Sequence, residues 1–214
     1  MRQLILASAL LMAACSHAMS HNASDDEMLT AAPGSIGYGM IEEADAEGVF
    51  ELIHNGQVSV RHVQSGMRCD FARDGVGGSI ALPPGSARGD AASCSWESER
   101  DASTLLVKRT SDTLDTAFAA AVTQLNSDFP GAQPARARSS ADAGAQPQPI
   151  RSALFVVWQR GARSVIGVWI ARVGGWTLQL RTTARAADPH AVESAEATGD
   201  AVMRGALADI AGGP

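Results

Sequence analysis

The chain has 214 residues and a formal net charge of −6 at pH 7, with 23 acidic residues against 17 basic ones. An acidic protein gains little from the negative phosphates of DNA or RNA, so the charge argues against nucleic acid as a partner. Length and composition by themselves name neither a reaction nor a ligand.

Residues 1–14 have the layout of a secretory signal peptide. The apolar run at 4–14 is eleven residues long, about half of the roughly 20 that a helix needs to cross a membrane. Arg2 precedes this run and small residues follow it, which is the pattern of a cleavable export signal. We therefore expect the chain to be exported.

The end of this leader, Met12-Ala13-Ala14-Cys15, resembles the lipobox of bacterial lipoproteins, although Met12 stands where leucine is usual. The resemblance implies that Cys15 carries diacylglycerol and palmitate and becomes the first residue of the mature chain. Ser16 after it implies attachment to the outer membrane, on the periplasmic face. The alternative is ordinary cleavage after Ala18, which would give a soluble periplasmic or secreted protein.

The count of cysteines agrees with export. The chain has three cysteines, and lipidation of Cys15 leaves Cys69 and Cys94, which we expect to form a disulfide in an oxidising compartment. Closing a loop of about 25 residues stabilises a fold by roughly 3 kcal/mol. The alternative is a pair of reduced thiols buried as small hydrophobic side chains.

Residues 15–39 are small and polar and contain no run of core residues. They predict a flexible tether with a reach of about 25 Å, followed by a globular domain at 40–213.

The first half of this domain is predicted to consist of strands. Segments 49–54 and 57–63 flank Asn55-Gly56, which is the strongest short signal for a hairpin with a two-residue turn. Shorter strands, expected to continue as a meander, are predicted at 67–72, 78–82, 92–97 and 103–110.

A helix follows at 111–129, because Leu114, Phe118 and Leu125 fall on one stripe and Ser111 or Thr113 can cap its start. Residues 130–150 are rich in Pro, Ala, Gln and Arg and predict a long surface loop, or a linker between two sub-parts of the domain.

Three more strands are predicted at 152–159, 164–171 and 176–182. The first two are nearly continuous apolar runs, which is typical of central strands, and the third alternates as if nearer an edge. Trp158 and Trp169 are expected in the core, whereas Trp96 or Trp176 is a candidate for lining a groove.

A closing helix is predicted with Asp188 as its cap and Pro189 in its first position, ending at Gly212-Gly213. The element order predicts an α+β fold, with antiparallel sheets and two helices packed on the sheet.

Two further resemblances concern this domain. The order of helix, long loop, three strands including 176–181 and closing helix is similar to the PsbP-like fold, over roughly residues 100–211. That fold hosts accessory and docking proteins, so the resemblance implies binding rather than catalysis. Separately, a set of residues looks like a paired-cysteine segment of uncharacterised bacterial exported proteins: His62, Ser65-Gly66, Cys69, Arg88-Gly89-Asp90 and Cys94.

Known catalytic patterns are missing from the sequence. It contains no nucleophile elbow, metalloprotease motif, nucleotide-binding loop or Cys-x-x-Cys pair, and we expect no metal or cofactor. We therefore expect a non-enzymatic protein. The alternative is an exported hydrolase-like enzyme with a site near His62, since catalytic triads are recognised by geometry rather than by sequence.

Charge is distributed unevenly along the chain. Residues 25–51 hold eight acidic side chains and no Lys or Arg, whereas 130–185 hold eight arginines. Four of these arginines fall at turns and strand ends of the last three strands: Arg160, Arg163, Arg181 and Arg185. Guanidinium groups bind phosphates and carboxylates in bidentate fashion. The cluster predicts docking of an anionic envelope component or envelope protein, and the alternative is an ordinary solvated surface.

These observations together predict a lipid-anchored periplasmic envelope protein that acts as a binding or accessory module. They do not predict its oligomeric state.

Overall fold

The computed structural model of the chain describes residues 32–72, 77–99, 101–138, 149–159, 161–186 and 190–212. These residues form three helices and two antiparallel sheets of three and seven strands. The predicted α+β fold class is therefore confirmed. The expected signal peptide, the lipidated Cys15 and the tether as far as residue 31 lie outside the described residues.

The small sheet consists of β1 (Phe50–Leu52), β2 (Val58–His62) and β3 (Arg68–Phe71), in that order. β1 and β2 form the predicted hairpin, with Phe50 opposite His62. The two-residue turn expected at Asn55-Gly56 is wrong. Such a turn needs positive φ at both positions, but only Gly56 has it, while the Asn55 side chain accepts a hydrogen bond of 3.0 Å from the Gln57 N–H. The loop is therefore wider.

Helix α2 (Pro33–Glu43) begins inside the segment predicted as a tether, so the folded domain starts near residue 32 rather than 40. Pro33 stands in the first turn, where a missing N–H costs nothing. Gly37 lies so close to the small sheet that a Cβ there would be 2.6 Å from the Leu52 side chain. The small residues that suggested a flexible segment are those that let this helix pack closely.

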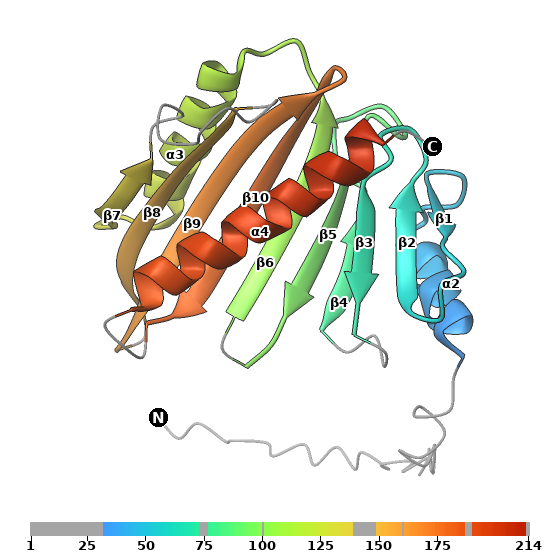
Figure 1. Cartoon of the computed structure of the whole chain (residues 1–214), viewed down its shortest axis with the longest axis horizontal. Coiled ribbons are helices and arrows are strands. Elements are labelled where there is room, and N and C mark those ends of the chain that lie inside the picture. The colour runs from blue at the N-terminus through green and yellow to red at the C-terminus, as the bar shows by residue number, and fades with distance from the viewer. Residues whose placement is uncertain are drawn as a thin grey trace, which may run out of the picture. The chain divides into compact units, whose positions relative to one another are not determined.

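The large sheet contains the remaining strands and runs from β4 at one edge to β7 at the other (Figure 1). Their spatial order is β4 (Gly78–Ala81), β5 (Ala91–Glu97), β6 (Asp101–Arg109), β10 (Trp176–Arg185), β9 (Ala162–Val173), β8 (Ile150–Gln159) and β7 (Gln133–Arg138). β6 pairs with β10 from Arg109 opposite Trp176 to Asp101 opposite Ala184. The two strand-rich halves of the chain thus share one sheet and are not separate sub-parts, and the expected meander is divided between the two sheets.

Two strand predictions need correction. β10, expected near an edge, is the central strand of the seven, and its alternation arises because one of its faces is only partly covered. β7 occupies part of the segment predicted as a loop. Its Pro134 is tolerated because β7 is an edge strand, and the pairing with β8 shifts register between Pro134 and Arg136.

The two predicted helices of the second half are confirmed as α3 (Leu114–Asp128) and α4 (Ala191–Ala211). The Thr113 hydroxyl caps α3 by accepting a 3.2 Å hydrogen bond from the Thr116 N–H. α4 starts at Ala191, and the expected cap residues Asp188 and Pro189 lie outside the described residues. None of the helices in the described ranges is long and apolar enough to span a membrane.

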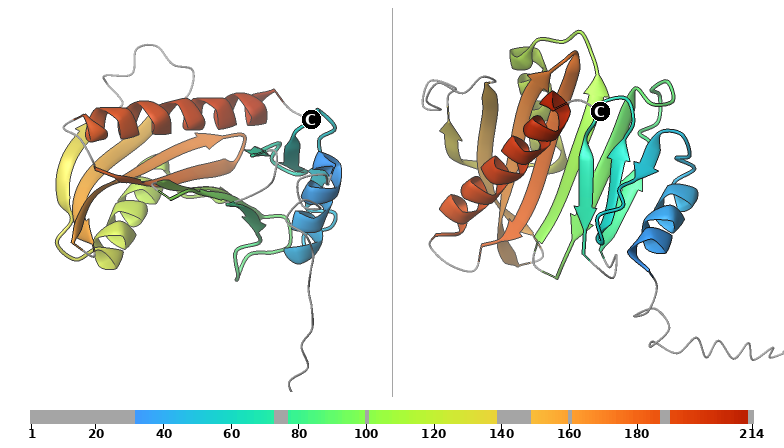
Figure 2. Two further views of the ribbon diagram at one scale, coloured as in Figure 1. Left: turned by 90° about the horizontal axis from the view of Figure 1, so that it is seen from below. Right: turned by 45° about the vertical axis from the view of Figure 1, so that its right-hand side comes forward.

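The large sheet is covered on both faces by different elements (Figure 2). α4 and the small sheet pack on one face and enclose the larger core cluster, to which α2 contributes Ile41. α3 packs on the other face, where Leu125 contacts a second cluster formed by β8 and β9.

Trp169 on β9 lies at the centre of the larger core and is fully buried. Its indole lies against two glycines, because a Cβ at Gly167 would be 2.1 Å from the ring and a Cβ at Gly199 of α4 would be 2.2 Å from it. The indole Nε1 donates a 2.9 Å hydrogen bond to Asp200. Trp158, which was also expected in the core, is instead 73% exposed beside the β8–β9 turn, opposite Arg163.

Cys69 on β3 and Cys94 on β5 lie at disulfide distance, with their Cα atoms 6.2 Å apart, which agrees with the predicted bridge. Both residues are fully buried. Because β3 belongs to the small sheet and β5 to the large one, this pair ties the two sheets together.

The contact between α4 and Trp169 gives a testable prediction. The substitution Gly199→Ala puts a methyl group into space that the indole occupies, and overpacking of this kind costs about 1–3 kcal/mol. We expect a loss of that size in the free energy of unfolding, measured by chemical denaturation.

Gly205→Ala is the matched control on the same helix, because a Cβ at Gly205 meets no atom within 4 Å. It should stabilise the protein by up to about 1 kcal/mol through helix propensity. If both substitutions stabilise the fold, the result would contradict the close packing of α4 on Trp169.

Candidate functional site

The hydrophobic core ends at Leu105 on β6 and Leu180 on β10, whereas on β8 and β9 it continues to Leu154 and Val165. Cys94, Leu105, Leu180 and Trp169 stand side by side on β5, β6, β10 and β9, and all are buried. Two residues further along each strand, side chains return to the same face. That next row is Trp96, Ser103, Thr182 and Gly167. The change from apolar to polar side chains marks the start of the candidate site.

Two adjoining depressions lie at this row. One, of about 210 Å³, lies between the ends of β6 and β10 and the first turns of α4. The other, of about 320 Å³, lies between β5, β6 and the segment after β3. Asp101 and Ser103 line both depressions, so we describe them together as the α4 trough. In Figure 1 the first part of β6 is covered neither by α4 nor by β3.

One wall of the α4 trough is formed by short side chains of the last helix. Ala191, Ser194, Ala195 and Thr198 follow a spacing of three and four residues, which places them on one side of α4. None of them carries a long side chain that could close the depression. The wall therefore presents two hydroxyl groups to the space above the sheet.

Thr182 lies at the floor of the trough and is only 7% exposed. Its Oγ1 has no hydrogen-bond partner among the residues that the structure describes. Leaving a buried polar group unpaired costs about 1–3 kcal/mol. A water molecule or a ligand group that reached this hydroxyl would recover that energy.

Trp96 forms part of the opposite end of the trough. Its indole Nε1 donates a 2.7 Å hydrogen bond to the Asp70 carbonyl, and its ring packs against Phe71 with 5.9 Å between the ring centroids. The polar atom of the indole is thus satisfied within the protein. The apolar carbon surface of the ring lines the depression. This agrees with the prediction that Trp96 lines a groove. Trp176, the other candidate, is buried.

The structure places the four predicted anion-binding arginines in different situations. Arg185 lies opposite Ser164 on the neighbouring strand, and the Arg163 carbonyl accepts a 2.9 Å hydrogen bond from Ala186, so these two arginines share one end of the sheet. Neither forms an ion pair within the described ranges. Arg160 lies outside them.

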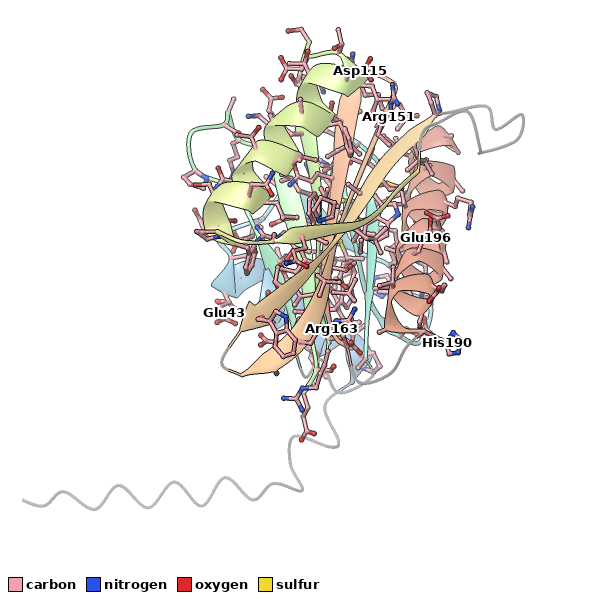
Figure 3. The ribbon with its side chains drawn as sticks, turned by 90° about the vertical axis from the view of Figure 1, so that its left-hand side faces the viewer. Glu43, Asp115, Arg151, Arg163, His190 and Glu196 are labelled. Atoms are coloured by element: carbon pink, nitrogen blue, oxygen red, sulfur yellow. A yellow bond between two sulfur atoms is a disulfide. The ribbon has the colours of Figure 1, made fainter. Side chains whose placement is uncertain are left out.

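Arg181 is already engaged by α3. It forms a 2.8 Å ion pair with Asp128 and stacks over the Phe129 ring at 5.0 Å. This hydrogen-bonded guanidinium lowers the pKa of the exposed Asp128 carboxyl. Figure 3 labels Arg163, which lies well away from the Arg151–Asp115 pair, where the charges are 2.8 Å apart.

His62, the centre of the enzyme alternative, is fully buried. Its ring lies edge-on to Phe50 and Trp176, with ring centroids 5.6 Å and 5.5 Å away. Nδ1 is 2.8 Å from the Ser65 hydroxyl, which also accepts a hydrogen bond from the Met67 N–H. A general base must reach its substrate, and this ring has no exposed edge. Its position favours a role in the core.

Burial, together with the nearby positive charge of Arg109, lowers the pKa of His62 to about 4. The Gly89 backbone opposes this shift, although it forms no regular hydrogen bond with Nε2. The ring is therefore neutral at pH 7.

Sequence reasoning found Trp96 but missed the other trough residues. The available signal was in β6, where Asp101 and Ser103 precede Leu105 and Val107 on the same face of the strand. A switch from polar to apolar along one face marks the place where the cover of a sheet ends. The partners of β6 across the sheet could not be read from the sequence.

Comparison with known proteins gives only distant structural similarity. No protein-family model matches the chain, and no curated protein matches it significantly. The solved structure of LpqN, involved in cell envelope biogenesis of Mycobacterium tuberculosis, is 12% identical over 56% of this chain and 78% of its own, with a TM-score of 0.35.

A second solved structure, PA94 from Pseudomonas aeruginosa, is a protein of unknown function suggested to be a regulator. It is 9% identical over 72% of this chain and 92% of its own, with a TM-score of 0.37. These comparisons do not confirm the resemblance to the PsbP-like fold.

The buried His62 predicts a dependence of stability on pH. Between about pH 6.5 and pH 4 the unfolded chain binds a proton at this residue and the folded chain does not. The free energy of unfolding should therefore fall as the pH is lowered through this range, by at most about 3 kcal/mol from this group.

Denaturation curves at several pH values would measure this slope. His62→Gln, which does not titrate, should flatten it, whereas His54→Gln removes an exposed histidine of the hairpin loop and should leave it unchanged. A slope unaffected by His62→Gln would contradict the assignment.

Proposed function

We propose that the protein is a lipid-anchored periplasmic protein of the bacterial outer membrane, whose α+β domain acts as a non-enzymatic binding or accessory module. The observation that carries the proposal is the buried Cys69–Cys94 pair between the two sheets. Structural disulfides persist in oxidising compartments and are rare in the cytosol. A chain that places such a pair in its core is suited to folding after export.

The third cysteine supports anchoring. Cys15 follows the eleven-residue apolar leader and is the one cysteine left over by the buried pair. Lipidation of Cys15 would remove the free thiol and attach the chain to a membrane. The residues from 16 to the start of α2 would then hold the domain at a distance of roughly 20 Å from the lipid surface.

Two features of the domain support binding over catalysis. The α4 trough is an open depression with polar groups and one aromatic ring, which is the usual composition of a ligand site. His62, the histidine around which a hydrolase site was considered, is enclosed in the core and held by Ser65.

Arg163 and Arg185 support docking of an anionic envelope component. Both lie at the same end of neighbouring strands, and neither has a carboxylate partner among the described residues. Because Arg185 is opposite Ser164 and side chains alternate along a strand, the two arginines belong to opposite faces of the sheet. Unpaired arginines of this kind are available for phosphate or carboxylate groups.

Anchoring is tested by the substitution Cys15→Ser. The wild-type protein should be found in the membrane fraction, and the variant should lose its acyl chains and no longer partition there as a lipoprotein. The intact mass of the wild-type mature protein should show a start at Cys15, the added acyl chains and the loss of two hydrogens at Cys69 and Cys94. A mature chain that begins after Ala18 would contradict the proposal.

Docking through these two arginines is tested with vesicles. The full chain should partition more strongly into phosphatidylglycerol than into phosphatidylcholine vesicles at low salt, and the preference should shrink at physiological salt because exposed charges are screened. The double substitution of Arg163 and Arg185 to Gln should abolish the preference. Arg88→Gln, which removes an arginine near Asp45 instead, is the control and should retain it.

A further inference from the structure

We propose that the α4 trough binds a neutral oligosaccharide, with Trp96 as a platform for a sugar ring and Asp101, Ser103, Ser194 and Thr198 as its hydrogen-bonding groups. The inference rests on the proposed function, because it names the ligand class of the binding module.

The lining matches the hydrogen-bonding character of sugar hydroxyls. A serine or threonine hydroxyl both donates and accepts, as a sugar hydroxyl does, so either partner can adapt to the other. Ser103 stands on the floor, and Ser194 and Thr198 stand on the wall formed by α4. Thr182 adds a hydroxyl without a partner among the described residues, in the row next to Ser103.

Asp101 adds an ionised acceptor at the point where the two depressions meet. Its side chain is exposed and makes no ion pair within the described part of the chain. A carboxylate accepts hydrogen bonds through two oxygens, and bonds to an ionised acceptor are stronger than bonds between neutral groups. Two adjacent hydroxyls of one sugar ring would satisfy both oxygens.

Trp96 supplies the apolar part of such a site. The face of an aromatic ring is electron-rich, whereas the C–H bonds on one face of a pyranose ring carry slight positive charge. Since the Trp96 Nε1 is satisfied by Asp70, the indole needs no polar partner from a ligand. A sugar ring can therefore lie on its carbon surface while the sugar hydroxyls turn toward Asp101 and Ser103.

The charge of the trough argues against an anionic ligand. Carboxylates of Asp101 and Glu97 line it, and Arg185 lies at the far end beside α4. A phosphate or carboxylate near Trp96 would meet these negative charges without a described cation beside it. A neutral ligand avoids this cost and still uses Asp101 as an acceptor.

The length of the trough indicates more than one sugar unit. Trp96 on β5 and the α4 wall are separated by the strands β6 and β10, and neighbouring strands lie about 4.8 Å apart. A ligand that contacts both Trp96 and Thr198 must extend over several strands. An oligomer should therefore bind more tightly than a single sugar.

The test is calorimetric titration of the full chain, kept in micelles of a detergent without a sugar head group. Chitohexaose and maltohexaose are the probes, with N-acetylglucosamine and glucose as their monomers. We expect saturable binding of at least one hexamer in the millimolar range or tighter, and weaker binding of its monomer. Trp96→Ala should weaken binding by about tenfold or more.

Trp158→Ala is the matched control, because Trp158 is an exposed tryptophan on β8 that does not line the trough. It should leave binding unchanged. Asp101→Ala is the second variant, since its exposed side chain contributes nothing to the core and its loss should weaken binding even if Trp96→Ala fails to fold.

Three results would overturn the inference. They are the absence of saturable binding of either hexamer, equal weakening by Trp158→Ala and Trp96→Ala, and preferential binding of a cationic probe such as trilysine. The anchoring test with Cys15→Ser is independent of all three. A chain that is anchored but binds no saccharide would leave the lipoprotein proposal in place and remove only the ligand class.

Discussion

The contact of one tryptophan with two glycines determines how the last helix sits on the large sheet. Trp169 fills the space above Gly167 and beneath Gly199, and its Nε1 is held by Asp200 of the same helix. Interiors are packed to nearly crystalline density, so a contact of this closeness leaves the helix little freedom to shift. The position of α4 then decides which rows of the sheet are covered and which are left open as the trough.

The same contact explains why the core and the candidate site are next to each other. On β6 and β10 the row that includes Trp169 is the last row of apolar side chains, and Ser103 and Thr182 in the next row are polar. Before Gly199, the side of α4 that lines the trough carries Ala191, Ser194, Ala195 and Thr198, which are too short to fill the space as Trp169 does. A small depression follows from the sizes of these side chains.

Local patterns predicted much of the fold, and contacts between distant segments did not follow from them. The stripe of Leu114, Phe118 and Leu125 was sufficient for α3, because helical periodicity is a property of neighbouring residues. α2 and β7 were missed because their segments are small or polar and contain no run of core residues. Only the close approach of Gly37 to Leu52 and the edge position of Pro134 show why these residues fit a helix and a strand. Trp158 was misplaced because an apolar run does not show where the cover of a strand ends.

The candidate site depends even more strongly on distant contacts. Trp96, Ser103 and Thr182 are brought into one row by the registers of three strands, and Ser194 joins them only through the packing of α4. The cysteine pair could be predicted from the sequence, because the chain has three cysteines and the expected lipidation of Cys15 leaves two.

The Cys69–Cys94 pair also affects when the chain can reach its final fold. Its two cysteines belong to different sheets, so the tie between them is missing wherever thiols are kept reduced. Under the proposed export, the chain would therefore cross the membrane before its two sheets are covalently joined, and it would be easier to unfold for translocation. Oxidation after export would then join the two sheets.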